Sequence, residues 1–117
     1  MVSEVDGLLK TIGIPTELNF RPSFTSNVDQ VISYHFFNEG ALKYGDGEIK
    51  AKGGALQVDL FVKHRINYLE TKSQIETILT KNGFKLVDID TTGEEVEGVG
   101  KLDHVVFRFN YKEGENN

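Results

Sequence analysis

Cysteine is absent from this 117-residue chain, and proline occurs only twice. The lack of cysteine excludes disulfide bonds, thiolate metal ligands and thiol nucleophiles. No apolar run approaches the roughly 20 residues that a helix needs to span a bilayer. The first residues include the acids Glu4 and Asp6, where a secretory signal would carry lysine or arginine. We therefore expect a cytosolic protein that does not engage a membrane.

A surplus of basic residues is also missing. Thirteen lysines and arginines face 18 aspartates and glutamates, which gives a net charge of −5. Proteins that bind nucleic acids concentrate basic side chains on one face, whereas the densest basic run here is only Lys63-His64-Arg65. We therefore expect no direct binding to DNA or RNA.

The clearest pattern that is present runs from Gly54 to Lys63. Its residues alternate strictly, and a period of two indicates a strand with one face in an apolar core. The apolar face comprises Leu56, Val58, Leu60 and Val62, and the opposite face comprises Gln57, Asp59 and Phe61. We interpret this stretch as the central strand of a single sheet.

The remaining patterns predict one α+β domain over residues 1–117, of a size usual for a single domain. Apolar residues at helical spacing indicate a helix before Gly13, which Ser3 could cap, and another from Asn67 to Gly83. Further strands are expected at residues 16–20, 30–37, 84–89 and 102–111, and a frayed polar tail at 112–117. The order is α-β-β-β-α-β-β, and we expect a mainly antiparallel sheet of four to five strands with both helices on one face.

Two glycine-rich segments are predicted to connect these strands. Residues 38–54 form a long loop between the second and third strands, or alternatively extend as a β-arm beyond the sheet. Residues 90–100 are acidic and are expected to be mobile. Long connections of this kind are usually functional.

The sheet face away from the helices offers one candidate chemical site. His35, Asp59, His104 and Arg108 fall on that face and could form an acid–base or ligand-binding group. A polar ladder on an exposed sheet face is the more ordinary interpretation, since no nucleophile accompanies them.

Cofactor motifs are weak. The three histidines lack the short spacing of metal motifs, and the glycines of residues 93–100 do not follow a strand-to-helix junction as phosphate-binding glycines do. Asp46 and Glu48 lie in a segment that resembles only a fragment of a calcium loop. We expect no metal and no other cofactor.

Four stretches occur in an order that resembles one known family. In sequence letters they are VISYHFFNEG at 31–40, ALQVDLFVK at 55–63, ILTKNGF at 78–84 and DHVVFRFNY at 103–111. Together they are similar to the small tail-terminator or tail-completion proteins of long-tailed phages and prophages. The resemblance covers most of the chain from Val31 onward.

The resemblance implies a structural protein and no enzyme. Such a subunit caps the head-proximal end of the tail tube, commonly as a six-fold ring, and joins the tail to the head connector. It would assemble in the host cytoplasm and end in the virion. A different head–tail joining subunit of the same fold fits equally well. The expected contact residues lie in the two glycine-rich segments and are Asn38, Glu39, Tyr44, Asp46, Glu48, Glu94, Glu95 and Glu97.

Overall fold

The computed structural model of this protein describes the backbone of residues 1–45 and 48–114, and the side chains of residues 1–40 and 52–114. A 3-10 turn at Val2–Glu4 leads into helix α1. The elements are then α1 (Val5–Lys10), β1 (Thr16–Leu18), β2 (Gln30–Gly45), β3 (Glu48–Lys63), α2 (Leu69–Lys81), β4 (Lys85–Val96) and β5 (Gly100–Gly114). This order confirms the predicted α-β-β-β-α-β-β arrangement.

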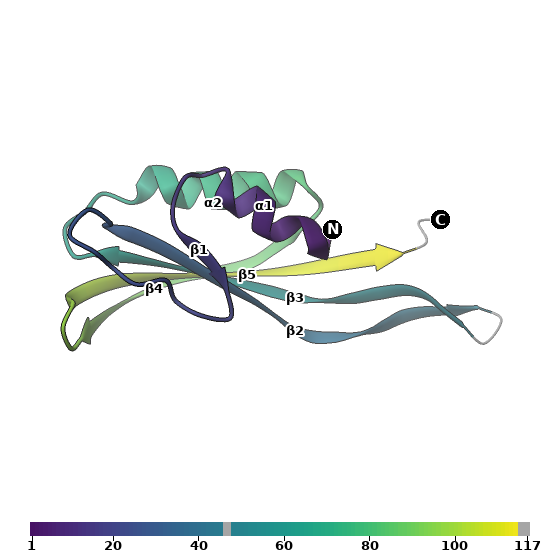
Figure 1. Cartoon of the computed structure of the whole chain (residues 1–117). Helices are drawn as coiled ribbons and strands as arrows, with labels where there is room; N and C mark the ends of the chain where they lie inside the picture. The colour runs from purple at the N-terminus through teal and green to yellow at the C-terminus, as the bar shows by residue number, and fades with distance from the viewer. Residues whose placement is uncertain (46–47, 115–117) are drawn as a thin grey trace.

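The strands form one five-stranded sheet in the order β1-β2-β3-β5-β4. β1 runs parallel to β2, and every other neighbouring pair is antiparallel. Both helices lie on the same face of the sheet, as predicted (Figure 1). The domain is therefore a two-layer α+β structure with β3 at its centre.

The apolar face of β3 is the middle of the core. Leu56, Val58, Leu60 and Val62 are completely buried, which confirms the face assigned from their alternation. The antiparallel register places Val58 opposite Phe107 of β5 and opposite Tyr34 of β2. The helices close this layer with residues such as Leu9 of α1 and Ile75 of α2. Burial of this continuous apolar layer is the main contribution to the stability of the fold.

Helix α1 is too short to persist alone, so its contacts with the sheet hold it. Val5 and Leu9 are completely buried, and the Tyr34 hydroxyl of β2 donates a hydrogen bond of 2.9 Å to Asp6 Oδ1. Burial, together with the Asp6 carboxylate, raises the pKa of Tyr34 to about 12. The cap expected from Ser3 does not form, because the helix follows directly from the 3-10 turn and has no side-chain cap.

Helix α2 ends just before Gly83, as its sequence predicts, but it begins at Leu69 and not at Asn67, and its N-cap residue Tyr68 makes no side-chain cap. Asn67 Oδ1 accepts the N–H of Leu69 at the N-terminus. At the C-terminus Gly83 has a φ of 94°, and the Phe84 N–H returns to the Leu79 carbonyl. In this glycine-terminated geometry, N–H groups that follow the helix pair with carbonyls of its last turn.

The segment predicted as a long loop at 38–54 is mostly strand, which confirms the alternative of a β-arm. β2 and β3 each have 16 residues and pair as a hairpin from Gln30 and Val62 to Gly45 and Glu48. The hairpin extends beyond the part of the sheet that the helices cover (Figure 1). The molecule measures 55 × 25 × 21 Å and has a radius of gyration of 15.9 Å, against about 13 Å for a compact domain of about this length.

Two other predictions about connections are wrong. Most of the acidic segment 90–100 belongs to β4, which runs to Val96 and leaves only residues 97–99 as a turn before β5. The polar tail is strand as far as Gly114, because Lys112 and Glu113 pair with Gly53 and Lys52. In both segments the backbone pairs with a neighbouring strand, and the exposed side chains can be polar, so no apolar pattern marks the strand in the sequence.

A buried charge in the central strand should unfold the domain. We expect Val58→Asp to lower the free energy of unfolding by more than about 4 kcal/mol, because a carboxylate without a partner would enter the core. Val87→Asp is the matched control, since Val87 of β4 is 54% exposed, and it should shift stability by only about 0.5 kcal/mol. Urea denaturation followed by circular dichroism measures both, and a well-folded Val58→Asp protein would show that the core face is misassigned.

Candidate functional site

The sheet face away from the helices carries a polar chain that joins β3 to β5. Asp59 is only 6% exposed, and its Oδ1 lies 2.8 Å from His104 Nε2 and 3.1 Å from Gln57 Nε2. His104 Nδ1 is directed toward Glu94 of β4, at 3.9 Å from its Oε2. The Asp59 carboxylate accepts from both the imidazole and the amide, so this buried charge is satisfied by two donors.

A segment that crosses this face covers part of it. Residues 19–29, here called the strap, pass from β1 across the side opposite the helices to the start of β2 (Figure 1). Arg21 of the strap places its guanidinium carbon 5.5 Å from the centre of the Phe61 ring, which is stacked on His104 with 4.2 Å between ring centroids. Lys63 Nζ donates to the Thr25 carbonyl at 2.9 Å.

The strap closes a second, small apolar layer. Val31, Leu102 and Val106 are 9% exposed or less, although they lie outside the main core. The sheet face away from the helices, which was expected to be exposed, is therefore covered at this end, where cation–π and backbone contacts hold the strap in place.

The four residues proposed for chemistry on this face do not form one site. Only Asp59 and His104 contact each other. Arg108 instead binds Asp88 and Asp90 of β4, with Nη1 at 3.0 Å from a carboxylate oxygen of each. The hydrogen bond to Asp88, followed by that to Asp90, raises the pKa of Arg108. His35 packs against Phe37, with 5.7 Å between ring centroids.

An Asp–His pair can serve as a general base when the second imidazole nitrogen is free to take a proton. His104 Nε2 is occupied by Asp59 at 2.8 Å, whereas Nδ1 lies 3.9 Å from Glu94 Oε2, beyond hydrogen-bond distance. Neither Asp59 nor His104 lines any of the four best-formed hollows of the described surface, although Glu94 lines one of them. The pair links β3 to β5 and does not itself border one of these hollows.

The contact residues predicted between β2 and β3 fall at the base of the hairpin and along it. Asn38 has a φ of 52°, and an extra residue in β2 bulges between Phe37 and Gly40. Glu39 Oε1 lies 3.5 Å from the Tyr111 hydroxyl, and burial followed by the carboxylates of Glu39 and Glu113 raises the Tyr111 pKa. The bulge therefore directs Glu39 to the helix side of the sheet.

The other predicted residues of this segment lie farther along the hairpin. Tyr44 belongs to β2 and Glu48 to β3, but their side chains are outside the described part of the structure. Asp46 lies outside the described residues altogether.

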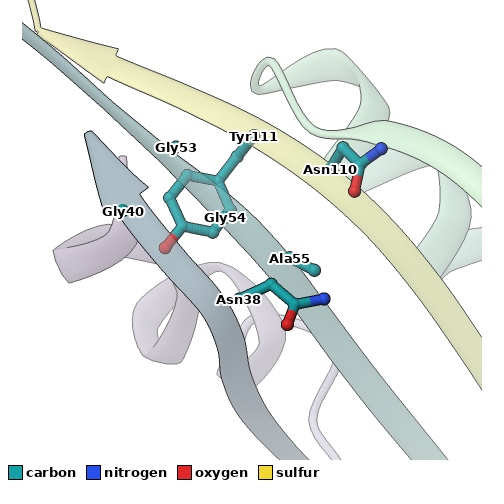
Figure 2. Close-up of a pocket in the computed structure, with 7 residues that line it drawn as sticks. All are labelled: Asn38, Gly40, Gly53, Gly54, Ala55, Asn110 and Tyr111. Atoms are coloured by element: carbon teal, nitrogen blue, oxygen red, sulfur yellow. The ribbon is translucent and has the colours of Figure 1, made fainter. Parts of the chain in front are cut away.

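A shallow hollow of about 470 Å³ opens beside the hairpin base. Figure 2 shows Asn38 of β2 and Asn110 of β5 on either side of a glycine stretch, with the Tyr111 ring lying across it. Gly54 is required here, because a Cβ on it would come within 2.8 Å of the Tyr111 hydroxyl. The remaining lining residues are Gly40, Gly53 and Ala55.

The predicted acidic residues lie along the free edge of the sheet. Glu94 and Glu95 are in β4, where Glu95 is opposite Lys101 of β5, and Glu97 follows in the turn. All three are exposed. β4 has no partner strand on its outer side among the described residues, and charged side chains protect such an edge against unspecific pairing.

Sequence patterns did not indicate two features of this surface. One is the stack of Arg21, Phe61 and His104, whose members are far apart in the chain. The other is Phe20, which is 73% exposed beside β1. The only local signal for the exposure of Phe20 is its position directly after Asn19, a residue type that favours turns.

No model of a known protein family matches the sequence, and no curated protein matches it either. Within the described residues, no helix is both long and apolar enough to cross a membrane. Across the same residues, no three His, Cys, Asp or Glu side chains gather into a possible metal site.

Removal of the buried carboxylate should destabilise the fold. We expect Asp59→Ala to cost about 1–3 kcal/mol of stability, because His104 and Gln57 would lose their acceptor in a largely buried place. Asp88→Ala removes an exposed acceptor from Arg108 and should shift the denaturation midpoint far less. Chemical denaturation of both variants tests this, and equal midpoints would show that the Asp59 pair is structurally unimportant.

Proposed function

We propose that this protein is a non-enzymatic assembly subunit that caps the head-proximal end of a phage tail tube and joins the tail to the head connector. The observation that carries the proposal is the β2–β3 hairpin, which continues past the helical layer (Figure 1). In this proposal, copies of the chain form a ring, assemble in the host cytoplasm and remain in the virion.

The hairpin is costly for an isolated domain. A two-stranded ribbon is marginally stable in water unless a third strand or a helix supports it. β5 supports the first part, as far as the pairing of Gly114 with Ala51, and no described strand pairs with the hairpin beyond that point. A contact with another subunit would supply the missing partner, which is the arrangement that an assembly protein requires.

The free strand edges supply the second argument. After Tyr34, no described strand pairs with the outer side of β2, and β4 is unpaired on its outer side as well. Exposed strand edges bind extended segments of other chains through main-chain hydrogen bonds. The acidic side chains of β4 favour a basic segment at that edge.

A ligand-binding or catalytic site on the sheet face is the second candidate function. The 2.8 Å contact between His104 and the buried Asp59 is the observation in its favour. The separation of His35 and Arg108 from this pair, and the absence of the pair from the lining of the four best-formed described hollows, make it the weaker proposal.

Electron microscopy of tail tubes tests the proposed function directly. Purified tubes that lack a cap would be incubated with the labelled chain and then with heads. We expect label at one end of each tube and restored joining of heads to tails. Label along the whole tube, or no label, would overturn the proposal.

Shortening the hairpin should separate folding from assembly. Gly40 and Gly53 pair directly, so residues 41–52 can be replaced by an Asn-Gly turn between them. We expect the thermal melt to stay close to that of the wild type, because no described core residue lies in the removed segment. We expect tube capping to be lost. Full capping by the shortened chain would contradict a role for the hairpin.

Charge reversal tests the acidic edge. The triple variant Glu94→Lys, Glu95→Lys, Glu97→Lys should weaken docking to the tail at least about tenfold while the melting temperature changes little, because exposed charges contribute little to stability. The control variant changes the same three residues to Gln, which removes the charge without reversing it and should have an intermediate effect. Unchanged docking by the lysine variant would show that the acidic edge faces no partner.

A further inference from the structure

Asn82 is the only asparagine of the chain that a glycine follows directly. Such a pair can modify itself, because the backbone nitrogen of the glycine can attack the side-chain amide carbon of the asparagine. Gly83 has no Cβ to hinder that approach. It is exposed to water, and Asn82 is half-buried at the end of α2. The groups that the reaction needs are therefore adjacent in the chain and reach solvent.

The native geometry of the pair opposes the attack. Ring closure requires the Gly83 nitrogen to eclipse the Cβ of Asn82. At the observed Asn82 ψ of 23°, the Gly83 nitrogen instead nearly eclipses the backbone nitrogen of Asn82 and so points away from the side chain. One backbone angle thus keeps the attacking atom away from its target.

Contacts at the end of α2 hold this angle. Asn82 Nδ2, the group that would leave, donates to the Ile78 carbonyl at 2.7 Å. The Gly83 N–H, whose proton must be lost before attack, donates to the Thr80 carbonyl at 3.3 Å. Phe84 is 2% exposed and anchors the chain beyond the pair in the core. A rotation that brings the two groups together has to break these contacts, so the reaction requires local opening of the helix end.

We propose that Asn82 is a self-modification site that the C-terminal end of α2 holds inactive. When this end opens, hydroxide removes the amide proton of Gly83, and the nitrogen bonds to Asn82 Cγ. The Cγ–Nδ2 bond breaks, and the amide group leaves as ammonia after taking a proton from water. Water then opens the cyclic imide, either at Cγ to give aspartate or at the backbone carbonyl to give isoaspartate. The whole reaction consumes one water, releases one ammonia and transfers no electrons.

Neither product can re-form the original helix end. Each has a carboxylate in place of the amide, and a carboxylate cannot donate to the Ile78 carbonyl. Its negative charge also lies at the C-terminus of a helix, where the helix dipole disfavours it. Isoaspartate in addition inserts a backbone carbon before Phe84, which packs against Tyr111 with 5.7 Å between ring centroids. Because the Tyr111 ring lies over Gly54, the change reaches the base of the hairpin (Figure 2).

Peptide mapping by mass spectrometry tests the site and its protection. The full chain would be incubated at mildly alkaline pH, once in native buffer with sodium chloride and once unfolded in guanidinium chloride of the same concentration. We expect Asn82 to convert first among the asparagines of the unfolded chain. In the native chain it should convert at least about tenfold more slowly, because only the opened fraction reacts. Earlier conversion of another asparagine would overturn the site, and equal rates at Asn82 would overturn its protection by the fold.

A looser helix end should speed the reaction. Phe84→Leu keeps an apolar residue but leaves part of the core unfilled, so Asn82 should convert at least about threefold faster in native buffer. Leu69→Ala is the matched control, since Leu69 is 66% exposed at the other end of α2, and its rate should equal that of the wild type. Circular dichroism verifies that both variants fold. An unchanged rate in Phe84→Leu, or an equal rise in Leu69→Ala, would show that the end of α2 does not control the reaction.

The effect of the product can be measured without waiting for the reaction. Asn82→Asp reproduces the aspartate product, whereas Asn82→Ala removes the amide donor without adding charge. We expect the melting temperature to fall from the wild type to Asn82→Ala and further to Asn82→Asp, because only aspartate places a carboxylate beside the Ile78 carbonyl. An Asn82→Asp chain that melts at or above the wild-type temperature would show that the product does not weaken the helix end.

Discussion

The burial of one face of β3 is the constraint on which the rest of the structure depends. Leu56, Val58, Leu60 and Val62 need a continuous cover, and the helices and the neighbouring strands supply it. Two short helices can cover only a limited length of sheet. β3 extends well past that length, so its glycine-rich first part leaves the core as one strand of the hairpin. The division of the molecule into a covered body and a projecting hairpin follows from this mismatch.

The boundary between body and hairpin is made by an aromatic side chain that lies over glycine. Tyr111 packs against Phe84 and Phe36, and its ring lies over Gly54, its partner in the register. A side chain at position 54 would displace this ring. The Tyr111 ring can therefore cover this end of the core only because residue 54 is glycine. The same glycine stretch, together with the Tyr111 ring, lines the shallow hollow beside Gly40. Core closure and a surface depression are thus two consequences of one local sequence.

The sequence was sufficient to predict elements whose side chains alternate between core and solvent. The face of β3 and the C-terminal end of α2 at Gly83 were predicted correctly because each depends on residues close in the chain. The glycines of the hairpin mask its alternation, so the pattern predicts a loop there. The predicted end of β4 at Ile89 is too early, because an edge strand needs no apolar face. Register in such segments comes from the neighbouring strand, which no local pattern encodes.

The candidate sites were predictable only in part for a similar reason. Placing Asp59 and His104 on one sheet face was correct, but their contact depends on β5 lying next to β3, which the order of elements leaves open. Arg108 is drawn away by Asp88 and Asp90 of β4, and this competition appears only when the edge strand is known to continue past Ile89. The strap is harder still, because Arg21 reaches Phe61 across forty residues of sequence.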